Sequence, residues 1–298
     1  MKKMLINACA LLLISNSIFA GDGDPKKIKG GLRITPQPTW FSVNSKNMEK
    51  YKAGFGFGFG MSLDFRCTDV IYFSTGLGGD FEGGTVKYHD YGMDPKVPST
   101  FTLGANQYIT DKSLAFVEAK DNVQYATTFD NNTVNFIDSR KVKTTHITIP
   151  LMLKMLTNEY SGIKYFGTFG GELGIRVGAK ANDKYRYQVV NGVSTSTVPP
   201  VITTGGENKD LNINGDAALF PIRVGMNVGA GIEYRLGGTT ALLFSINYFK
   251  AFTNLMKIHS DNIYTEATTD AASGKVDFKN SEQNIKMNAI RINIGFMF

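Results

Sequence analysis

His146 is considered first for chemistry, because it is the only one of three histidines that falls in a predicted strand. Ser139, Thr144 and Thr148 lie nearby and would be nucleophiles if this imidazole served as their base. No hydrolase motif surrounds them, so an interior histidine with satisfied hydrogen bonds fits the pattern better. We therefore predict no catalytic site, and loss of a measured hydrolase activity in His146→Ala would overturn that expectation.

The sequence gives no indication of a metal, a cofactor or a disulfide. His89 and His259 stand alone, so we expect no metal site. Glycines recur at every second residue between 54 and 60 and never give the Gly-x-Gly-x-x-Gly spacing of a dinucleotide loop, so we expect no cofactor. Cleavage of a leader would leave Cys67 as the single cysteine, which excludes an internal disulfide.

A set of charged residues lies on strand faces that otherwise carry small or polar side chains. Counted along each predicted strand from the end nearest the chain termini, these charges fall into three levels, and every level contains both signs. They are Asp64, Lys154, Glu233 and Arg235 at the low level, Glu172 and Arg291 midway, and Asp80, Glu82, Arg176 and Arg223 at the high level. Buried charges persist only when they are paired and hydrogen-bonded, so we predict a layered ion network. Residual interior water, or a bulge that reverses the parity of a strand, is the alternative.

The stretch from Lys52 to Phe65 shows best which element positions such charges. Phenylalanine, methionine and leucine alternate there with glycine, serine and aspartate, so one face is wholly apolar and the other is small or polar. A period of two predicts a strand, and about 9 to 11 tilted residues cross a bilayer within a closed barrel. A low-complexity tail or a soluble barrel or sandwich strand, with its phenylalanines inward, would be the competing interpretation.

Seven further segments alternate in the same way. The eight predicted strands are Gly31–Val43, Lys52–Phe65, Val70–Tyr88, Lys141–Leu156, Ile163–Lys180, a strand from near Ala217 to Leu236, Thr240–Met256 and Ile285–Phe298. Pro36 and Pro38 lie in the first, where proline predicts a bulge or a locally open ladder. Turns after the second, fourth and sixth strands are short, whereas the connections 89–140, 182–216 and 257–284 are long.

This alternation of loop lengths favours a membrane barrel over a soluble one. It puts all long connections at one end and both termini at the other, which is the outer-membrane pattern. A soluble eight-stranded barrel would have to turn its phenylalanine, leucine and isoleucine side chains into an interior that only just holds its own side chains. We predict an all-β fold, an eight-stranded antiparallel up-and-down transmembrane β-barrel with three long extracellular loops.

The amino terminus predicts export. Lys2 and Lys3 precede an apolar run from Met4 to Ile14, and Ala20 offers a small residue for cleavage, so residues 1–20 are predicted to be a signal peptide and residues 21–298 the barrel domain. A retained helical anchor is the alternative, although the apolar run is short for a membrane span. We expect a bacterial outer-membrane location with both termini in the periplasm.

Several segments resemble a known family. The Gly-rich alternating strands, the run Ile149-Pro150-Leu151-Met152-Leu153-Lys154 and the end Ile294-Gly295-Phe296-Met297-Phe298 resemble the PorT-like, or porin family, outer-membrane barrels. In such barrels the aromatic carboxyl terminus is a recognition signal for the outer-membrane insertion machinery, and the resemblance gives this role to Phe296 and Phe298. Some relatives serve a secretion system, so the resemblance implies an envelope location and leaves the mechanism open.

Three functions follow from these patterns. The first is a non-enzymatic anchor whose long loops bind surface or secretion-system partners, since binding residues often lie on loops held by a rigid scaffold. The second is a small porin, although eight strands normally leave no open lumen. The third is a hydrolase. Outer-membrane lipid is an expected partner and nucleic acid is not, because the three long connections carry net charges of about −3, −1 and −2 while nucleic-acid binding needs basic surfaces.

Overall fold

The computed structural model describes residues 27–44, 48–88, 102–103, 115–119, 122–126, 133–190, 201–213, 219–256, 259–269, 276–282 and 284–298. The predicted signal peptide, residues 1–20, lies outside this part of the chain. Within it the chain forms strands, and no helix there is long and apolar enough to cross a membrane.

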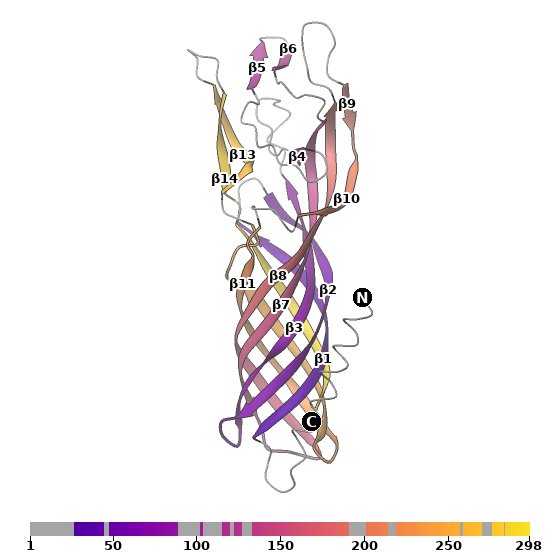
Figure 1. Ribbon diagram of the computed structural model, residues 1–298, viewed down its shortest axis with the longest axis vertical. Coiled ribbons are helices and arrows are strands. Elements are labelled where there is room, and N and C mark those ends of the chain that lie inside the picture. The colour runs from indigo at the N-terminus through magenta and orange to yellow at the C-terminus, as the bar shows by residue number, and fades with distance from the viewer. Residues whose placement is uncertain are drawn as a thin grey trace.

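Eight strands close into a single antiparallel barrel (Figure 1), which confirms the predicted fold. They are β1 Ile28–Val43, β2 Met48–Arg66, β3 Ile71–Tyr88, β7 Thr133–Leu156, β8 Ile163–Val190, β11 Ile222–Gly237, β12 Thr240–Ala251 and β15 Ile285–Met297. Each pairs with the next in this order, and β15 pairs with β1, so the ring leaves no free edge. Closure gives every strand a hydrogen-bonded neighbour on both sides, as a bilayer requires.

One end of the barrel, which we call the turn end, carries the short connections 67–70, 157–162 and 238–239. Two of these turns use glycine at positive φ, Gly162 at 80° and Gly238 at 56°. The last residue lies at the same end, where Gly30 and Phe298 exchange backbone hydrogen bonds of 3.0 and 2.8 Å. The opposite end, the loop end, receives the long connections.

The two prolines of β1 interrupt one of its ladders, as predicted. The strand pairs with β2 continuously from Ile28 to Thr39, but its pairing with β15 stops at Ile34 and resumes at Thr39. Pro36 and Pro38 lie in that gap, because proline has no N–H to donate to a neighbouring strand.

The alternation of each strand separates lipid-facing from interior side chains. The apolar residues of β2 point outward and are exposed, up to 77% for Phe55, while Gly56 and Gly58 on the other face are buried or close to neighbouring side chains. Interior glycine makes room for large groups that come from other strands. A Cβ on Gly225 would lie 2.6 Å from two ring atoms of Phe249, and one on Gly84 would lie 2.8 Å from the ring of Phe41.

Strands β7 and β8 are longer than the sequence predicts. They contain 24 and 28 residues, so both continue past the loop end and pair with each other as far as Thr133 and Val190. Short strands flank this projection: β4 Thr102–Leu103 pairs with β7, and β9 Val201–Thr204 and β10 Glu207–Asn212 pair with β8. The predicted limits at Lys141 and Lys180 mark where apolar alternation stops, but the ladder does not depend on lipid-facing apolar residues and runs on.

Two hairpins complete the loop end. They are formed by β5 Ala115–Ala119 with β6 Asn122–Ala126, and by β13 His259–Thr269 with β14 Val276–Glu282. Figure 1 shows both at the same end of the barrel as the projection of β7 and β8. Strands β11 and β12 are shorter than predicted at this end, since β11 begins at Ile222 and β12 stops at Ala251.

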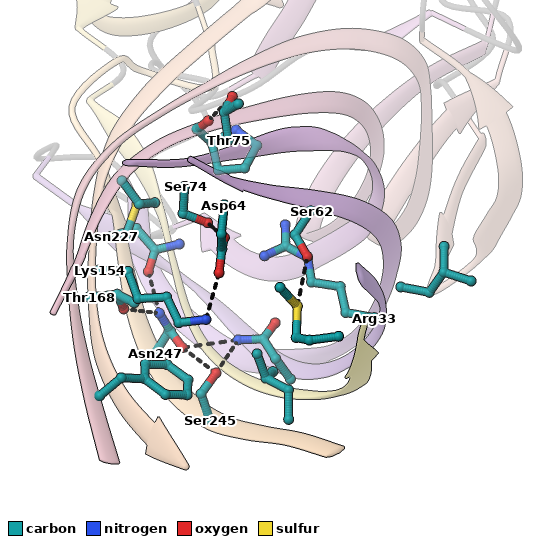
Figure 2. Close-up of a pocket in the computed structure, with 17 residues that line it drawn as sticks. Arg33, Ser62, Asp64, Ser74, Thr75, Lys154, Thr168, Asn227, Ser245 and Asn247 are labelled. Carbon is teal, nitrogen blue, oxygen red and sulfur yellow. Dashed lines mark hydrogen bonds and ion pairs between the residues drawn. The ribbon is translucent and has the colours of Figure 1, made fainter. Parts of the chain in front are cut away.

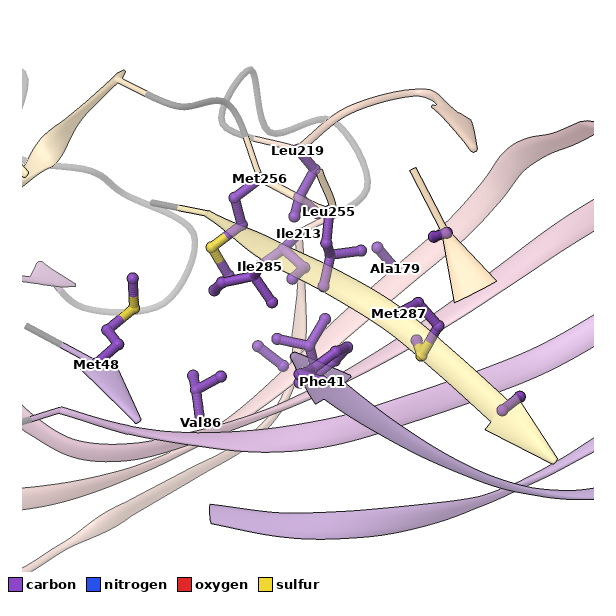
Figure 3. Close-up of a cluster of buried hydrophobic side chains, with 14 of the residues drawn as sticks. Phe41, Met48, Val86, Ala179, Ile213, Leu219, Leu255, Met256, Ile285 and Met287 are labelled. Carbon is purple, nitrogen blue, oxygen red and sulfur yellow. The ribbon is translucent and has the colours of Figure 1, made fainter. Parts of the chain in front are cut away.

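An apolar plug fills the barrel interior at the loop end (Figure 3). It consists of Phe41, Met48, Val86, Val142, Ala179, Ala181, Ile213, Leu219, Phe249, Ala251, Leu255, Met256, Ile285, Met287 and Ala289. Leu255 and Met256 were predicted as the end of a strand, but their segment turns inward after Ala251 and is tied by a 2.7 Å hydrogen bond from Leu255 N to Ile285 O. Burying these side chains closes the interior at the level of the loops.

Candidate functional site

The interior of the barrel changes character in layers, which the inward residues of β15 record in order. From the loop end they are Ile285, Met287 and Ala289 in the apolar plug, then Arg291, then Asn293. All are buried. The charged layer therefore lies directly beneath the apolar plug and above an uncharged polar layer.

Two arginines and three carboxylates form what we call the central ion cluster: Asp80, Glu82, Glu172, Arg223 and Arg291. The Arg291 guanidinium donates to Glu82 at 3.0 Å, to Asp80 at 3.3 Å and through both terminal nitrogens to Glu172, where one contact is 3.1 Å. The Arg223 guanidinium donates to Glu172 at 2.6 Å and to Glu82, and lies 3.5 Å from Asp80. Each carboxylate thus contacts both arginines.

The surroundings of the central ion cluster supply its remaining contacts. Gln37 accepts a 2.9 Å hydrogen bond from Arg291 Nε. The ring of Phe249 lies 4.2 Å from the Arg291 guanidinium and 4.6 Å from that of Arg223, so one aromatic side chain of the apolar plug covers both cations. Arg33 lies closer to the turn end, opposite Gly295, and adds a further positive charge that acts on Asp80 and Glu172 electrostatically.

A second group of charges, the turn-end ion cluster, consists of Asp64, Lys154 and Glu233 (Figure 2 shows the first two). The Lys154 ammonium donates to Asp64 at 2.7 Å and to Glu233, and it stands 4.6 Å from the centre of the Phe166 ring. Lys29 approaches Glu233 at 3.9 Å and balances the second carboxylate. The side chains of Asp64, Lys154 and Glu233 are at most 4% exposed although they lie near the turn end of the barrel.

Amides and hydroxyls form the uncharged polar layer, in which they hydrogen-bond one another. The Asn247 amide donates to Asn227 and Thr168 at 3.0 Å, and the Asn293 amide donates to Asn247 at 3.0 Å and to Ser245 at 2.9 Å (Figure 2). The cavity that these residues line, with Asp64 and Lys154 among them, holds about 60 Å³. That volume admits a few waters and no larger solute.

The structure brings eight of the ten predicted network residues into these two clusters. The exceptions are Arg176, which is half-buried and donates to Leu219 O at 3.4 Å, and Arg235, whose side chain is 58% exposed and pairs with Glu159 at the turn end. The predicted middle and high levels are one layer, because Arg291 and Glu172 contact Asp80, Glu82 and Arg223 directly. Strands in a barrel tilt and are staggered, so a count along each strand does not give height in the barrel.

Sequence reasoning missed five contributors to the interior. Lys29, Arg33 and Gln37 share the inward parity of β1, so the alternation of that strand contains the signal that identifies them. Arg140 and Asp183 form a buried bidentate pair with distances of 2.7 Å near the loop end, inside the extension of β7 and β8 that was predicted as loop. Nothing in the sequence indicated that extension.

His146 is buried, as predicted, but the hydrogen bonds expected for an interior histidine are incomplete. Its Nδ1 lies 3.6 Å from Glu82 and forms no hydrogen bond within the described part of the chain. Thr144 Oγ1 is likewise without a partner there, so among the described residues this hydroxyl does not pair with the imidazole. Among the described residues no group of histidine, cysteine, aspartate or glutamate side chains could hold a metal.

Comparison with solved structures returns outer-membrane barrels. Ail, the attachment invasion locus protein of Yersinia pestis, is 10% identical with a TM-score of 0.29 over 92% of this chain and 100% of that chain. OprG from Pseudomonas aeruginosa is 10% identical with a TM-score of 0.36 over 91% and 94%, and the outer membrane protease OmpT from Escherichia coli is 9% identical with a TM-score of 0.36 over 94% and 99%. No curated protein sequence matches the chain.

Residues 28–257 match the family described as outer membrane protein beta-barrel domain. The matched region begins with β1 and runs past β12, so it contains seven of the eight barrel strands and both ion clusters except for Arg291. The chain belongs to this family of bacterial outer-membrane β-barrel proteins.

Proposed function

We propose that the protein is a non-enzymatic outer-membrane anchor that holds binding surfaces beyond the membrane. The observation that carries the proposal is the contrast between the two parts of the barrel. Its interior is filled by the apolar plug and two ion clusters, whereas β7 and β8 continue into a projecting sheet with β4, β9 and β10. A filled lumen supports anchoring over transport, and a rigid sheet is a good platform for loops that bind.

The orientation in this proposal places the loop end outside the cell and both termini in the periplasm, as short turns and long loops favour. Cys67 offers a direct test, because it is exposed in the turn that joins β2 and β3. A membrane-impermeant maleimide should leave Cys67 unlabelled in intact cells and label it after the outer membrane is permeabilised. The double variant Cys67→Ser/Ser194→Cys moves the thiol to a long connection and should be labelled in intact cells.

Binding by the loop end is tested by deletion. Removing residues 91–132 leaves β7 whole and keeps every barrel strand. The variant should still run as a folded, heat-modifiable species on gels but lose the partners that chemical crosslinking attaches to the full-length protein in intact cells. A deletion of residues 191–200 provides a control for shortening a loop. If removal of residues 91–132 and removal of residues 260–283 both leave every crosslink unchanged, loop binding is not the function.

A channel is the alternative that can be excluded most directly. Purified monomer in a planar bilayer should show no steady openings, because solute would have to displace the apolar plug. Regular single-channel steps from the wild type would contradict the anchor proposal. We expect neither a nucleic-acid partner nor a hydrolase activity that depends on His146.

Membership in the narrower PorT-like group is part of the same proposal. It rests on the run from Ile149 to Lys154 and on the aromatic residues Phe296 and Phe298, through which we propose that the insertion machinery recognises the chain. Phe298→Ala should slow assembly in cells and leave the stability of the assembled barrel nearly unchanged. Association with a secretion system would then appear among the crosslinked partners.

A further inference from the structure

The outer surface of the barrel changes from apolar to basic at the loop end. On β7 the outward residues Met155, Leu153, Leu151 and Ile147 are exposed and apolar, and the next outward residues past Thr145 are Lys143 and Lys141. The neighbouring strands add two more lysines: Lys180 on β8 pairs with Lys143, and Lys87 on β3 pairs with Ser139, two residues beyond Lys141. We call Lys87, Lys141, Lys143 and Lys180 the lysine patch.

The height of the lysine patch agrees with the thickness of a membrane. Lys143 lies twelve positions before Met155, which at about 3.3 Å per residue and a tilt of about 45° corresponds to about 28 Å along the membrane normal. An outer-membrane barrel carries an apolar band of about 25 Å. The ammonium groups of the lysine patch therefore lie just beyond that band, at the depth of lipid headgroups.

The barrel interior also changes at this level, from polar within the apolar band to apolar at the loop end, which is opposite to the change on the outer surface. Within the apolar band β7 places Lys154 inside and Leu153 outside, whereas at the loop end it places Val142 inside and Lys141 and Lys143 outside. The direction in which each residue of β7 points does not change, but the polar and apolar residues exchange faces. This exchange occurs next to the irregularity between Thr145 and His146 in the pairing of β7 with β8. Two independent patterns, outside and inside, thus mark one boundary of the membrane.

Within the described residues no ion pair joins the lysines of the patch on β7 and β8 to a carboxylate, although Glu49 is directly opposite Lys87 on β2. Lys184, which pairs with Ser139 at the register position of Lys87, lies 3.7 Å from Glu207. Lys143 and Lys180 are directly opposite each other on adjacent strands. Like charges in that arrangement are destabilising, so the site favours an anion that contacts both.

We propose that the lysine patch binds the phosphorylated headgroup of a lipid in the membrane leaflet on the loop side. Lysine ammonium groups act as point charges for phosphate, and acyl chains of the same lipid would lie against Ile147 and the neighbouring apolar residues. Aromatic side chains suited to an interface border the patch, since Tyr51 lies 5.7 Å from Lys87 Nζ and 4.8 Å from Lys52 Nζ. The proposal rests on the orientation given above, in which this leaflet is the outer one.

The test uses the folded full-length protein in a neutral detergent. It is titrated with a diphosphorylated glucosamine-disaccharide lipid and with phosphatidylethanolamine, and bound lipid is counted by native mass spectrometry. The test variant is Lys141→Gln/Lys143→Gln/Lys180→Gln. The control variant removes three cations at the turn end, Arg66→Gln/Lys164→Gln/Arg235→Gln.

We expect the wild type and the control variant to bind the diphosphorylated lipid and prefer it to phosphatidylethanolamine. The test variant should bind it about 100-fold more weakly, since each lysine near an anionic headgroup contributes a factor of about five. Without lipid the test variant should be at least as resistant to urea as the wild type, because it has lost the opposed Lys143 and Lys180; added lipid should protect only proteins that keep the patch.

Equal binding by the test variant and the wild type would overturn the proposal. Displacement of the lipid by inorganic phosphate at an equal concentration would overturn it in another way, because the acyl chains would then add nothing and free anion would be the ligand. These results do not depend on orientation, which the Cys67 labelling measures separately, so failure of the lipid site is distinguishable from failure of the proposed topology.

Discussion

Removing Arg291 should destabilise the barrel more than any other single change in the central ion cluster. Its guanidinium contacts Glu172, Asp80 and Glu82, donates to Gln37 and stacks on Phe249. Arg291→Met keeps an unbranched side chain but removes the charge, which leaves Asp80, Glu82 and Glu172 in contact with Arg223 alone. Breaking a buried ion pair in this one-sided way costs about 3 to 5 kcal/mol, because a desolvated charge remains uncompensated.

The double variant Arg291→Met/Glu172→Leu separates this charge effect from a loss of packing. Asp80 and Glu82 then keep their contacts with Arg223, and the change removes one positive and one negative charge together, so the net charge of the cluster is unchanged. Replacing a buried ion pair by apolar groups of similar volume is often close to neutral. We therefore expect the double variant to recover much of the loss, with a coupling energy of about 2 to 3 kcal/mol between the two positions, toward the upper end of what double-mutant cycles give for residues in contact.

Urea unfolding of the purified protein in lipid vesicles provides the measurement. The single tryptophan, Trp40, lies 6.4 Å from Tyr248 on the outer face of the barrel, so its fluorescence should report loss of the barrel wall. Arg235→Met is the matched control, because it makes the same chemical change at an exposed residue paired only with Glu159 among the described residues, and it should alter stability by less than about 0.5 kcal/mol. Strictly additive effects of Arg291→Met and Glu172→Leu would refute the reasoning.

Three further changes, with one control, test the packing and the charge balance of the clusters by the same unfolding assay. Phe249→Ala removes a fully buried ring that covers both arginines and should cost about 3 to 5 kcal/mol; a loss below about 1 kcal/mol would mean that the apolar plug collapses around the gap. Gly225→Val should cost at least about 1 to 3 kcal/mol, since its Cβ would lie 2.6 Å from the Phe249 ring and from Lys250 O. Lys154→Met should cost about 3 to 5 kcal/mol by leaving Asp64 and Glu233 together, and Lys164→Met, at a half-exposed pair, should cost almost nothing.

The sequence contains most of the fold because the membrane imposes a simple rule on each strand. Apolar side chains must face lipid, so Phe55, Phe57 and Phe59 on one parity and glycine on the other determine both the strand and its orientation. The same rule places Asp64, Glu172 and Arg291 inside. The rule does not apply to residues beyond the bilayer, and this is why the extensions of β7 and β8 were predicted as loop.

Contacts inside the barrel were less predictable than positions, because they depend on stagger and on the reach of long side chains. Arg291 on β15 meets Glu172 on β8, which is not a neighbouring strand, and no local pattern reports that distance. Arg235 has inward parity but lies where the mouth opens to solvent, beside a cavity of about 270 Å³, so parity alone did not predict burial. Stagger also merged the predicted middle and high levels into one layer.

The ion clusters are better explained by specificity than by stability. Because apolar replacements of buried ion pairs are often neutral or stabilising, stability gives little reason to keep Arg223, Arg291 and three carboxylates in the interior. A strand that is apolar on both faces, however, would lose the period of two that decides which face meets lipid, and a slip by one residue would reverse every side chain. In the apolar band polar residues point inward, and at the loop end Val142 points inward while Lys141 and Lys143 point outward. A slip of β7 by one residue would therefore turn its inward charged side chain in the apolar band, Lys154, toward lipid. It would also turn Lys141 and Lys143 into the apolar plug. Both changes are unfavourable, so both disfavour the same wrong register.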